Sequence, residues 1–96
     1  MQFTTQVKEG EHKGAFVAIA EDGTQAGEMT YSWAGEDKFI IDHTEVEEAF
    51  GGMGVGKTIF EAAVAYAREK GVKIMPLCPF AAGMFKKSDA YKDVLF

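Results

Sequence analysis

The sequence predicts an α+β fold with a mixed sheet: a four-strand antiparallel meander, a helix, a parallel fifth strand and a short C-terminal helix. Three observations predict it. Up to residue 46, strand-like segments alternate with turn residues, as in a meander. A glycine-rich stretch at 51–58 then opens a segment with helical apolar spacing. An apolar segment at 72–77 follows that helix, and a strand reached through a helix lies parallel to the strand before it.

Four strands are expected in the first half of the chain. Residues 3–7 alternate weakly and predict a short edge strand, whereas 15–20 are apolar and partly β-branched. Residues 25–34 contain the alternating run Thr30-Tyr31-Ser32-Trp33 and predict the third strand, and residues 38–46 predict the fourth. Polar residues at 9–14, the tight turn signal Glu21-Asp22-Gly23-Thr24 and residues 35–37 separate them.

The long helix is expected from about Gly54 to Lys70, with Gly71 as its C-cap. This assignment places Gly54 and Gly56 in the first turn, although glycine weakens a helix by ~1 kcal/mol per interior residue. Such a cost indicates that a ligand or another backbone segment comes close there. The alternative is a flexible turn that happens to precede a helix.

The C-terminal third predicts a strand, a short helix and a packed tail. Pro76 donates no ladder hydrogen bond, so the strand at 72–77 should end or become an edge there. Pro79 suits the start of a helix over 80–87. The apolar residues of that helix share one face: Phe80, Ala81, Met84 and Phe85. The tail at 88–96 should pack back on the sheet.

Composition limits the classes of function. The 96 residues are expected to form one domain, 1–96, with an ordinary core, since 47% of them are hydrophobic. A net charge of −5 argues against nucleic acid as a partner. Cys78 is the one cysteine, which indicates a reduced, cytoplasmic protein. The first residues lack the pattern of a signal peptide, and no apolar run approaches the ~20 residues that span a bilayer.

The glycine-rich stretch fits two phosphate-binding motifs. Free N–H groups at a helix start, together with the helix dipole, bind anions. Residues 51–58 match the GxxxxGK[ST] loop of nucleotide triphosphatases. That loop should follow a buried parallel strand, but the acidic stretch 45–48 precedes it here. A magnesium-binding Asp should also end another buried strand, whereas 72–77 runs into Cys78. Lys57 is retained only as a phosphate contact.

The same stretch resembles the pyrophosphate loop of GNAT-type N-acetyltransferases, Arg/Gln-x-x-Gly-x-Gly/Ala, with Gly54-Val55-Gly56 as its second half. The order of strands, loop, helix, strand and short helix is similar to the GNAT core. Within it, residues from about 26 to 95 resemble the small stand-alone YjdJ-type members. The segments that carry the resemblance are 42–46, 52–57, Lys73-Ile74, 78–81 and 91–94.

The resemblance implies an acetyl-CoA site and transfer of the acetyl group to an unidentified primary amine, without a metal. The pyrophosphate would lie on the N–H groups of 51–57, and the pantetheine arm between the splayed fourth and fifth strands. The implied cofactor-binding residues are Val46, Gly51, Gly52, Met53, Gly54, Val55, Gly56, Lys57, Cys78, Phe80 and Phe85. Only the turn at 9–14 stands where larger members cover the acceptor site. An open site suits a protein or peptide amine, with the chain a monomer or weak homodimer.

Three positions depart from the family pattern. Gly51 replaces the first Arg or Gln of the loop, and Met53 replaces a polar residue, so the loop keeps backbone donors but loses side-chain donors. Phe85 stands where many members have a tyrosine that protonates the departing thiolate. Tyr91 lies further along. The missing tyrosine favours an alternative function, a non-catalytic CoA-binding module.

Three residues are candidates for catalysis. His43 and Glu45 are two apart on a strand and therefore share one face, where either could accept a proton from the amine. The bland alternatives are a core histidine and a solvated glutamate. Cys78 takes the place of a family asparagine at a helix start, which favours a thiolate and allows an acyl-cysteine relay. Its alternative is a small buried hydrophobe. Direct transfer is the preferred mechanism.

Overall fold

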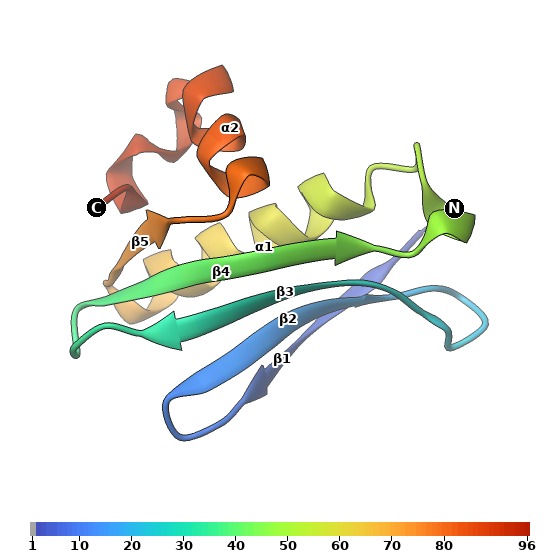
Figure 1. Cartoon of the computed structure of the whole chain (residues 1–96), viewed down its shortest axis with the longest axis horizontal. Coiled ribbons are helices and arrows are strands. Elements are labelled where there is room, and N and C mark those ends of the chain that lie inside the picture. Colours follow the sequence, from blue (N-terminus) through green and yellow to red (C-terminus); the bar gives the residue numbers. More distant parts are fainter. Residues whose placement is uncertain (1) are drawn as a thin grey trace.

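The computed structural model describes residues 2–96 and confirms the mixed α+β fold. Five strands form one sheet in the order β1-β2-β3-β4-β5. The first four pair antiparallel, and β5 lies parallel to β4 (Figure 1). The elements are β1 (Thr4–Glu9), β2 (Lys13–Ile19), β3 (Gln25–Trp33), β4 (Lys38–Val46), α1 (Val55–Lys70), β5 (Lys73–Pro76) and α2 (Pro79–Lys87), with two short 3₁₀ helices, η1 (Glu48–Phe50) and η2 (Asp89–Val94).

The first hairpin is longer than the sequence predicts. Strand pairing extends to Glu9 opposite Gly14, inside the stretch expected to be a turn. A Cβ atom at Gly14 would lie 2.5 Å from the Tyr31 hydroxyl oxygen and equally close to the Lys8 carbonyl oxygen. Gly14 is therefore required because the Tyr31 side chain crosses the strand there, and not because the chain turns.

A bulge in β4 decides which side chains face the helices. Tyr31 pairs with Ile41 and Thr30 pairs with His43, so Asp42 is an extra residue in the strand. Before the bulge, the buried Ile41 points toward α1. After it the alternation is reversed, so Thr44 faces the helices while His43 faces the other side of the sheet.

Glycines in left-handed conformation delimit α1 at both ends. Gly54 is the N-cap with φ 77°, and Gly71 is the C-cap with φ 69°. The helix thus begins at Val55, and the expectation that Gly54 lies in the first turn is wrong. Gly56 does lie in that turn. The C-cap at Gly71 is as expected, and its N–H bonds the carbonyl oxygens of Ala67 and Arg68.

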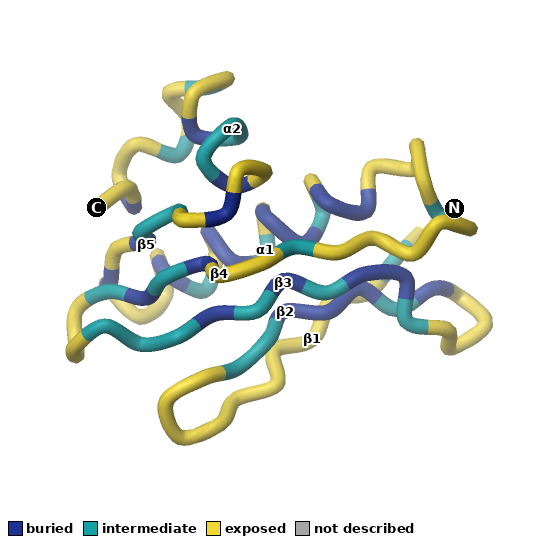
Figure 2. Tube along the Cα trace, viewed as in Figure 1, coloured by how far each residue is buried: buried dark blue, intermediate teal, exposed yellow. Residues whose placement is uncertain are grey.

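The core lies between α1 and one face of the sheet (Figure 2). Phe16, Tyr31 and Phe39 from three strands meet Tyr66 of α1, with ring centroids 4.9–6.1 Å apart. Tyr66 donates a 2.6 Å hydrogen bond to Glu9, which ties β1 to the helix. Burial raises the pKa of Tyr66, and the bond to Glu9 acts in the same direction, so its hydroxyl remains a donor.

The strand β5 is shorter than the six residues expected, because Val72 takes part in the C-terminal cap of α1 and not in the sheet. The Val72 N–H donates to the Ala67 carbonyl oxygen at 2.9 Å. At the other end, the N–H groups of Leu77 and Cys78 both lie 3.2 Å from the Ile41 carbonyl oxygen. Pairing with β4 stops at this point, while β4 itself continues to Val46 (Figure 1). The two strands therefore part, as the family resemblance implies.

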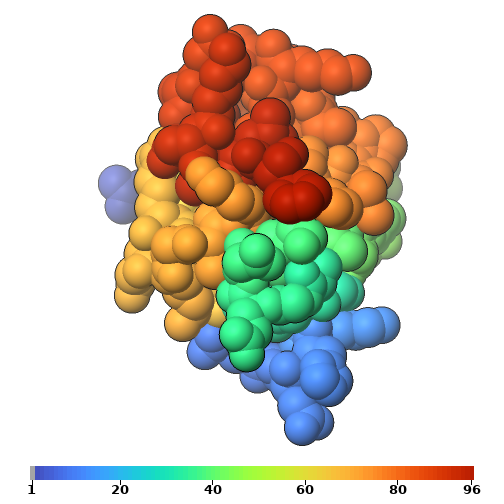
Figure 3. Space-filling model, turned by 90° about the vertical axis from the view of Figure 1, so that its left-hand side faces the viewer, coloured from blue at the N-terminus to red at the C-terminus, as the bar shows by residue number. Residues whose placement is uncertain are grey.

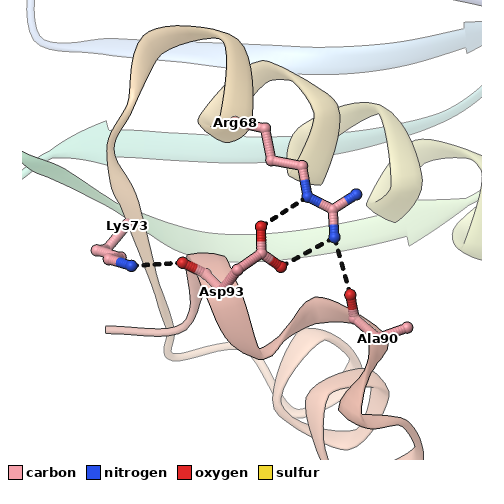
Figure 4. A network of polar contacts seen from close by, with 4 residues as sticks. All are labelled: Arg68, Lys73, Ala90 and Asp93. Carbon is pink, nitrogen blue, oxygen red and sulfur yellow. Dashed lines mark hydrogen bonds and ion pairs between the residues drawn. The ribbon is translucent and has the colours of Figure 1, made fainter.

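The C-terminal tail packs back on the sheet, as expected. Asp93 accepts two hydrogen bonds from the Arg68 guanidinium, at 2.8 and 2.9 Å, and Arg68 also donates to the Ala90 carbonyl (Figure 4). Lys73 bonds the Asp93 carbonyl oxygen. The last residue, Phe96, donates its N–H to Ile74 and lies under the Lys38 ammonium group. In Figure 3 the tail, in red, covers this end of the molecule.

The Arg68–Asp93 contact gives a stability prediction with a defined pH dependence. Hydrogen bonds from Arg68 hold the pKa of Asp93 below its ordinary value of 3.8. The carboxylate therefore stabilises the fold above pH 3.8, and that contribution is lost as the pH falls through the lower, folded pKa. We expect Asp93→Asn to lower the Tm at pH 7, and its difference from the wild type to close below pH 3.8.

Asp89→Asn is the matched control for this experiment. Asp89 pairs with Lys92 at 3.3 Å, but both side chains are highly exposed, at 86% and 69%. Exposed pairs of this kind contribute little. Thermal unfolding followed by circular dichroism measures both variants, and equal losses of Tm would contradict the assigned role of Asp93.

Candidate functional site

A cavity of about 640 Å³ lies at the N-terminal end of α1. It is bounded by the end of β4, the glycine loop, α2 and the start of the tail. Its volume falls in the range of small-molecule sites, ~300–1,000 Å³. The lining residues are Val46, Phe50, Gly51, Gly52, Gly54, Val55, Gly56, Lys57, Phe80, Met84, Lys87, Ser88 and Tyr91.

The glycine loop presents backbone donors to this cavity. The N–H groups of Gly51 and Met53 donate to Glu48 and Phe50 within turns. Within residues 2–96, the N–H groups of Gly52 and of 54–57 have no backbone acceptor. Together with the positive end of the helix dipole, these groups form a site for an anion. Lys57 adds a positive side chain at the same wall.

The glycines of the loop are required for different physical reasons. Gly52 and Gly54 have φ of 78° and 77°, and a Cβ atom on either would meet no heavy atom within 4 Å. They are required by backbone conformation and not by close approach. At Gly56 a Cβ atom would lie 2.7 Å from Cζ of Phe80. The group that comes close to the first turn of α1 is thus the ring of Phe80, from the first turn of α2.

Cys78 lies where β4 and β5 part and caps the N-terminus of α2. Its Sγ atom accepts a hydrogen bond from the Ala81 N–H at 3.4 Å and lies 3.3 Å from the Thr44 hydroxyl. The residue is only 4% exposed and does not line the cavity. Sequence reasoning missed Thr44, because only the bulge at Asp42 turns its side chain toward the helices.

His43 and Glu45 share one face of β4, as predicted, but that face lies opposite Cys78. Their side chains are 65% and 74% exposed, and His43 Nε2 lies 3.3 Å from Glu45 Oε1. The exposure rules out the core-histidine alternative for His43. Nearby on the same face, the Ser32 hydroxyl donates to Asp42 at 2.6 Å. This face is polar and open to solvent, and a substrate amine could reach it.

Most, but not all, of the predicted cofactor residues meet at the cavity. Met53, Cys78 and Phe85 do not line it, and Phe85 instead packs against Phe60 and Tyr91 at centroid distances of 5.1 and 6.4 Å. Other residues line the cavity without having been predicted to bind the cofactor: Phe50, Met84, Lys87, Ser88 and Tyr91. Helical periodicity could have found two of these residues, since positions 80, 84 and 87 fall on one face of a helix.

The structure also limits other kinds of site. Tyr91 hydrogen-bonds Glu61 of α1 at 3.3 Å, so its hydroxyl lies beside the helix and not at Cys78. Among residues 2–96, no group of three His, Cys, Asp or Glu side chains could hold a metal ion. In the same part of the chain, no helix has the length and hydropathy to cross a bilayer.

Comparisons with known proteins agree on one family. A family model described as GCN5-related N-acetyl-transferase matches residues 15–94. An NMR structure of a GCN5-like N-acetyltransferase candidate from Staphylococcus aureus shares 38% identity, with a TM-score of 0.71 over 95% of this chain and 87% of that one. No curated protein matches the chain.

Two larger enzymes share the fold. Nourseothricin acetyltransferase is 30% identical, with a TM-score of 0.57, over 68% of this chain and 39% of its own. AAC(6')-Iy, in complex with the bisubstrate analogue CoA-S-monomethyl-acetylneamine, is 19% identical, with a TM-score of 0.56, over 85% of this chain and 62% of its own. At that identity the second likeness concerns the fold alone.

A pair of alanine variants can separate the two reasons for glycine, namely backbone conformation at Gly54 and contact with Phe80 at Gly56. Gly54→Ala should lower the free energy of unfolding by about 1 kcal/mol, because it places a side chain in the left-handed region. It should leave the NMR signals of the Phe80 ring in place. Gly56→Ala should shift those signals, because its Cβ displaces the ring, and should lose less stability since alanine favours the helix.

Urea unfolding and aromatic NMR spectra measure both effects. Gly54→Asn serves as the control, because asparagine tolerates the left-handed conformation better than alanine does. Unchanged Phe80 signals in a folded Gly56→Ala variant would contradict the contact between the two helices.

Proposed function

This chain belongs to the GCN5-related N-acetyltransferase family, and on that premise we propose that it transfers the acetyl group of acetyl-CoA to a primary amine. The family and its solved relatives support acetyl transfer in general. One observation carries the proposal for this chain. The cavity joins free backbone donors at the start of α1 to the end of β4, close to the place where β4 and β5 part.

The glycine loop is the proposed site of the CoA pyrophosphate. Its free N–H groups at Gly52 and 54–57 supply hydrogen bonds, and the helix dipole and Lys57 supply positive potential. AAC(6')-Iy, which shares the fold, binds a ligand with a CoA moiety, which supports CoA as the co-substrate. The Thr58 hydroxyl donates to the Gly54 carbonyl at 3.0 Å, a bond across the first turn of the helix. Membership of the acetyltransferase family favours CoA over ATP as the ligand.

The parting of β4 and β5 is the proposed path of the pantetheine arm. Beyond Ile41, β4 has no β5 partner within the described residues, so the backbone groups on this edge of 42–46 are available to the pantetheine amides. An arm that follows this edge brings the thioester to Cys78 and Thr44. The acetyl carbon would then be accessible from the opposite face, where His43 and Glu45 lie.

In the proposed reaction the neutral amine attacks the thioester carbonyl carbon directly. The carbon–sulfur bond breaks, CoA leaves as the thiolate, and the amine loses a proton. Glu45 or His43 accepts that proton, directly or through water. Because Cys78 is only 4% exposed, its thiol is poorly accessible as the nucleophile of a relay. The exposed polar face around Ser32 and Asp42 suits a protein or peptide amine, in the reducing environment of the cytoplasm.

A non-catalytic CoA-binding module is the second candidate function. Phe85 carries no hydroxyl, and Tyr91 is bonded to Glu61, so neither supplies an acid to the departing thiolate. This observation favours binding without turnover. Release of CoA from acetyl-CoA in the presence of candidate amines, followed by mass spectrometry, distinguishes the two functions.

The nucleotide preference of the loop is the first test. Titration with CoA should shift the backbone amide signals of 52–57, whereas ATP with magnesium should shift them much less at equal concentration. The free N–H groups explain binding of the pyrophosphate, and membership of the acetyltransferase family explains the preference for CoA. If these amides respond to ATP with magnesium and ignore CoA, the triphosphatase interpretation is correct.

The second test compares Cys78→Ala with Glu45→Gln. Direct transfer predicts that Cys78→Ala keeps much of its activity, while Glu45→Gln loses about 10²-fold, the lower end for a general base. The loss should be largest at low pH, where the amine is charged. The assay measures CoA release, and intact mass spectrometry looks for an acetyl group on the protein. An acetylated Cys78 that passes its acetyl group to an amine would overturn direct transfer.

A further inference from the structure

We infer that Lys87, Ser88 and Tyr91 form a subsite for the 3'-phosphorylated adenosine end of CoA, through which the protein distinguishes CoA from dephospho-CoA. The inference rests on the proposed function, since it assumes that CoA occupies the cavity. It concerns a wall of the cavity that neither the pyrophosphate nor the thioester needs. That wall runs along α2 to its C-terminal end and into the tail.

Positive charge is concentrated in this cavity although the chain is acidic overall. Lys57 and Lys87 line it, and no Asp or Glu side chain is among the lining residues. Within residues 2–96 neither lysine is in an ion pair with a carboxylate. The loop N–H groups and Lys57 already offset the charge of the pyrophosphate. Lys87 therefore supplies a second cationic group, which fits a second phosphate on the same ligand.

The neighbouring residues suit an adenosine. The Ser88 oxygen accepts the Ala90 N–H at 3.1 Å, so its own O–H can donate to a phosphate oxygen. Met84 and the half-buried ring of Tyr91 provide an apolar surface for a base. Tyr91 is held edge-on against Phe60 at 5.0 Å, which fixes the plane of its ring.

The tail that carries Ser88 and Tyr91 is fixed from a distance. Arg68 bonds both the Asp93 carboxylate and the Ala90 carbonyl, one residue before Tyr91 (Figure 4). Arg68 is thus a positioning residue for the subsite and touches no ligand. A tail held by these bonds needs less ordering when Ser88 and Tyr91 meet the ligand, which reduces the entropy cost of binding.

Calorimetric titration of CoA and dephospho-CoA tests the inference. The wild type should bind CoA about tenfold more tightly, the effect of one charge-assisted hydrogen bond. Lys87→Gln should bind the two ligands about equally, mainly by weaker binding of CoA. Lys86→Gln is the matched control, because Lys86 is the adjacent residue of α2, is exposed and does not line the cavity. It should keep the preference.

The amide signals of Lys87 and Ser88 provide a second readout. They should shift with CoA and much less with dephospho-CoA. Equal affinity of the wild type for both ligands, or a preference that survives Lys87→Gln, would overturn the subsite and leave the proposed function intact. If the wild type binds neither ligand, the proposed function fails and the subsite fails with it.

Discussion

The end of the hydrogen-bond ladder between β4 and β5 at Ile41 is the constraint on which the site depends. The Ile41 carbonyl oxygen accepts both the Leu77 and the Cys78 N–H, so one acceptor closes the ladder. Pro76 has no N–H to continue it, and Pro79 starts a helix at once. The next residues of β4 are left with a free edge. A sheet fully paired along both strands would have no opening beside the glycine loop.

Local signals in the sequence were sufficient for the element order and for most boundaries. Glycine at 71 ends a helix because the left-handed C-cap conformation is nearly free only for glycine, and this requirement can be read without a structure. Likewise, Pro76 and Pro79 mark the end of β5 and the start of α2. The glycine loop at the start of α1 and the shared face of His43 and Glu45 were predictable on the same basis, namely short-range spacing.

Features that depend on the partner strand could not be predicted. The bulge at Asp42 exists only in the register with β3, and it decides that Thr44 and not His43 meets Cys78. Gly14 resembles a turn residue in the sequence, because the side chain that requires glycine there, Tyr31, lies on the next strand, 17 residues along the chain. Part of the far wall of the cavity was missed because Met84 was grouped with the buried Ala81 and Phe85 on the apolar face of α2, whereas Met84 lines the cavity together with Lys87.

A loop that binds its ligand through backbone groups also changes which sequence positions are constrained. Substitution at Lys57 leaves its free peptide N–H in place, so the backbone part of the proposed anion contact survives the change. At Gly54 and Gly56 the selected property is a missing atom, for backbone torsion in one case and for room beside Phe80 in the other. Divergent descendants of this chain should therefore keep glycine at positions 54 and 56 even where exposed side chains of the loop, such as Met53, have changed.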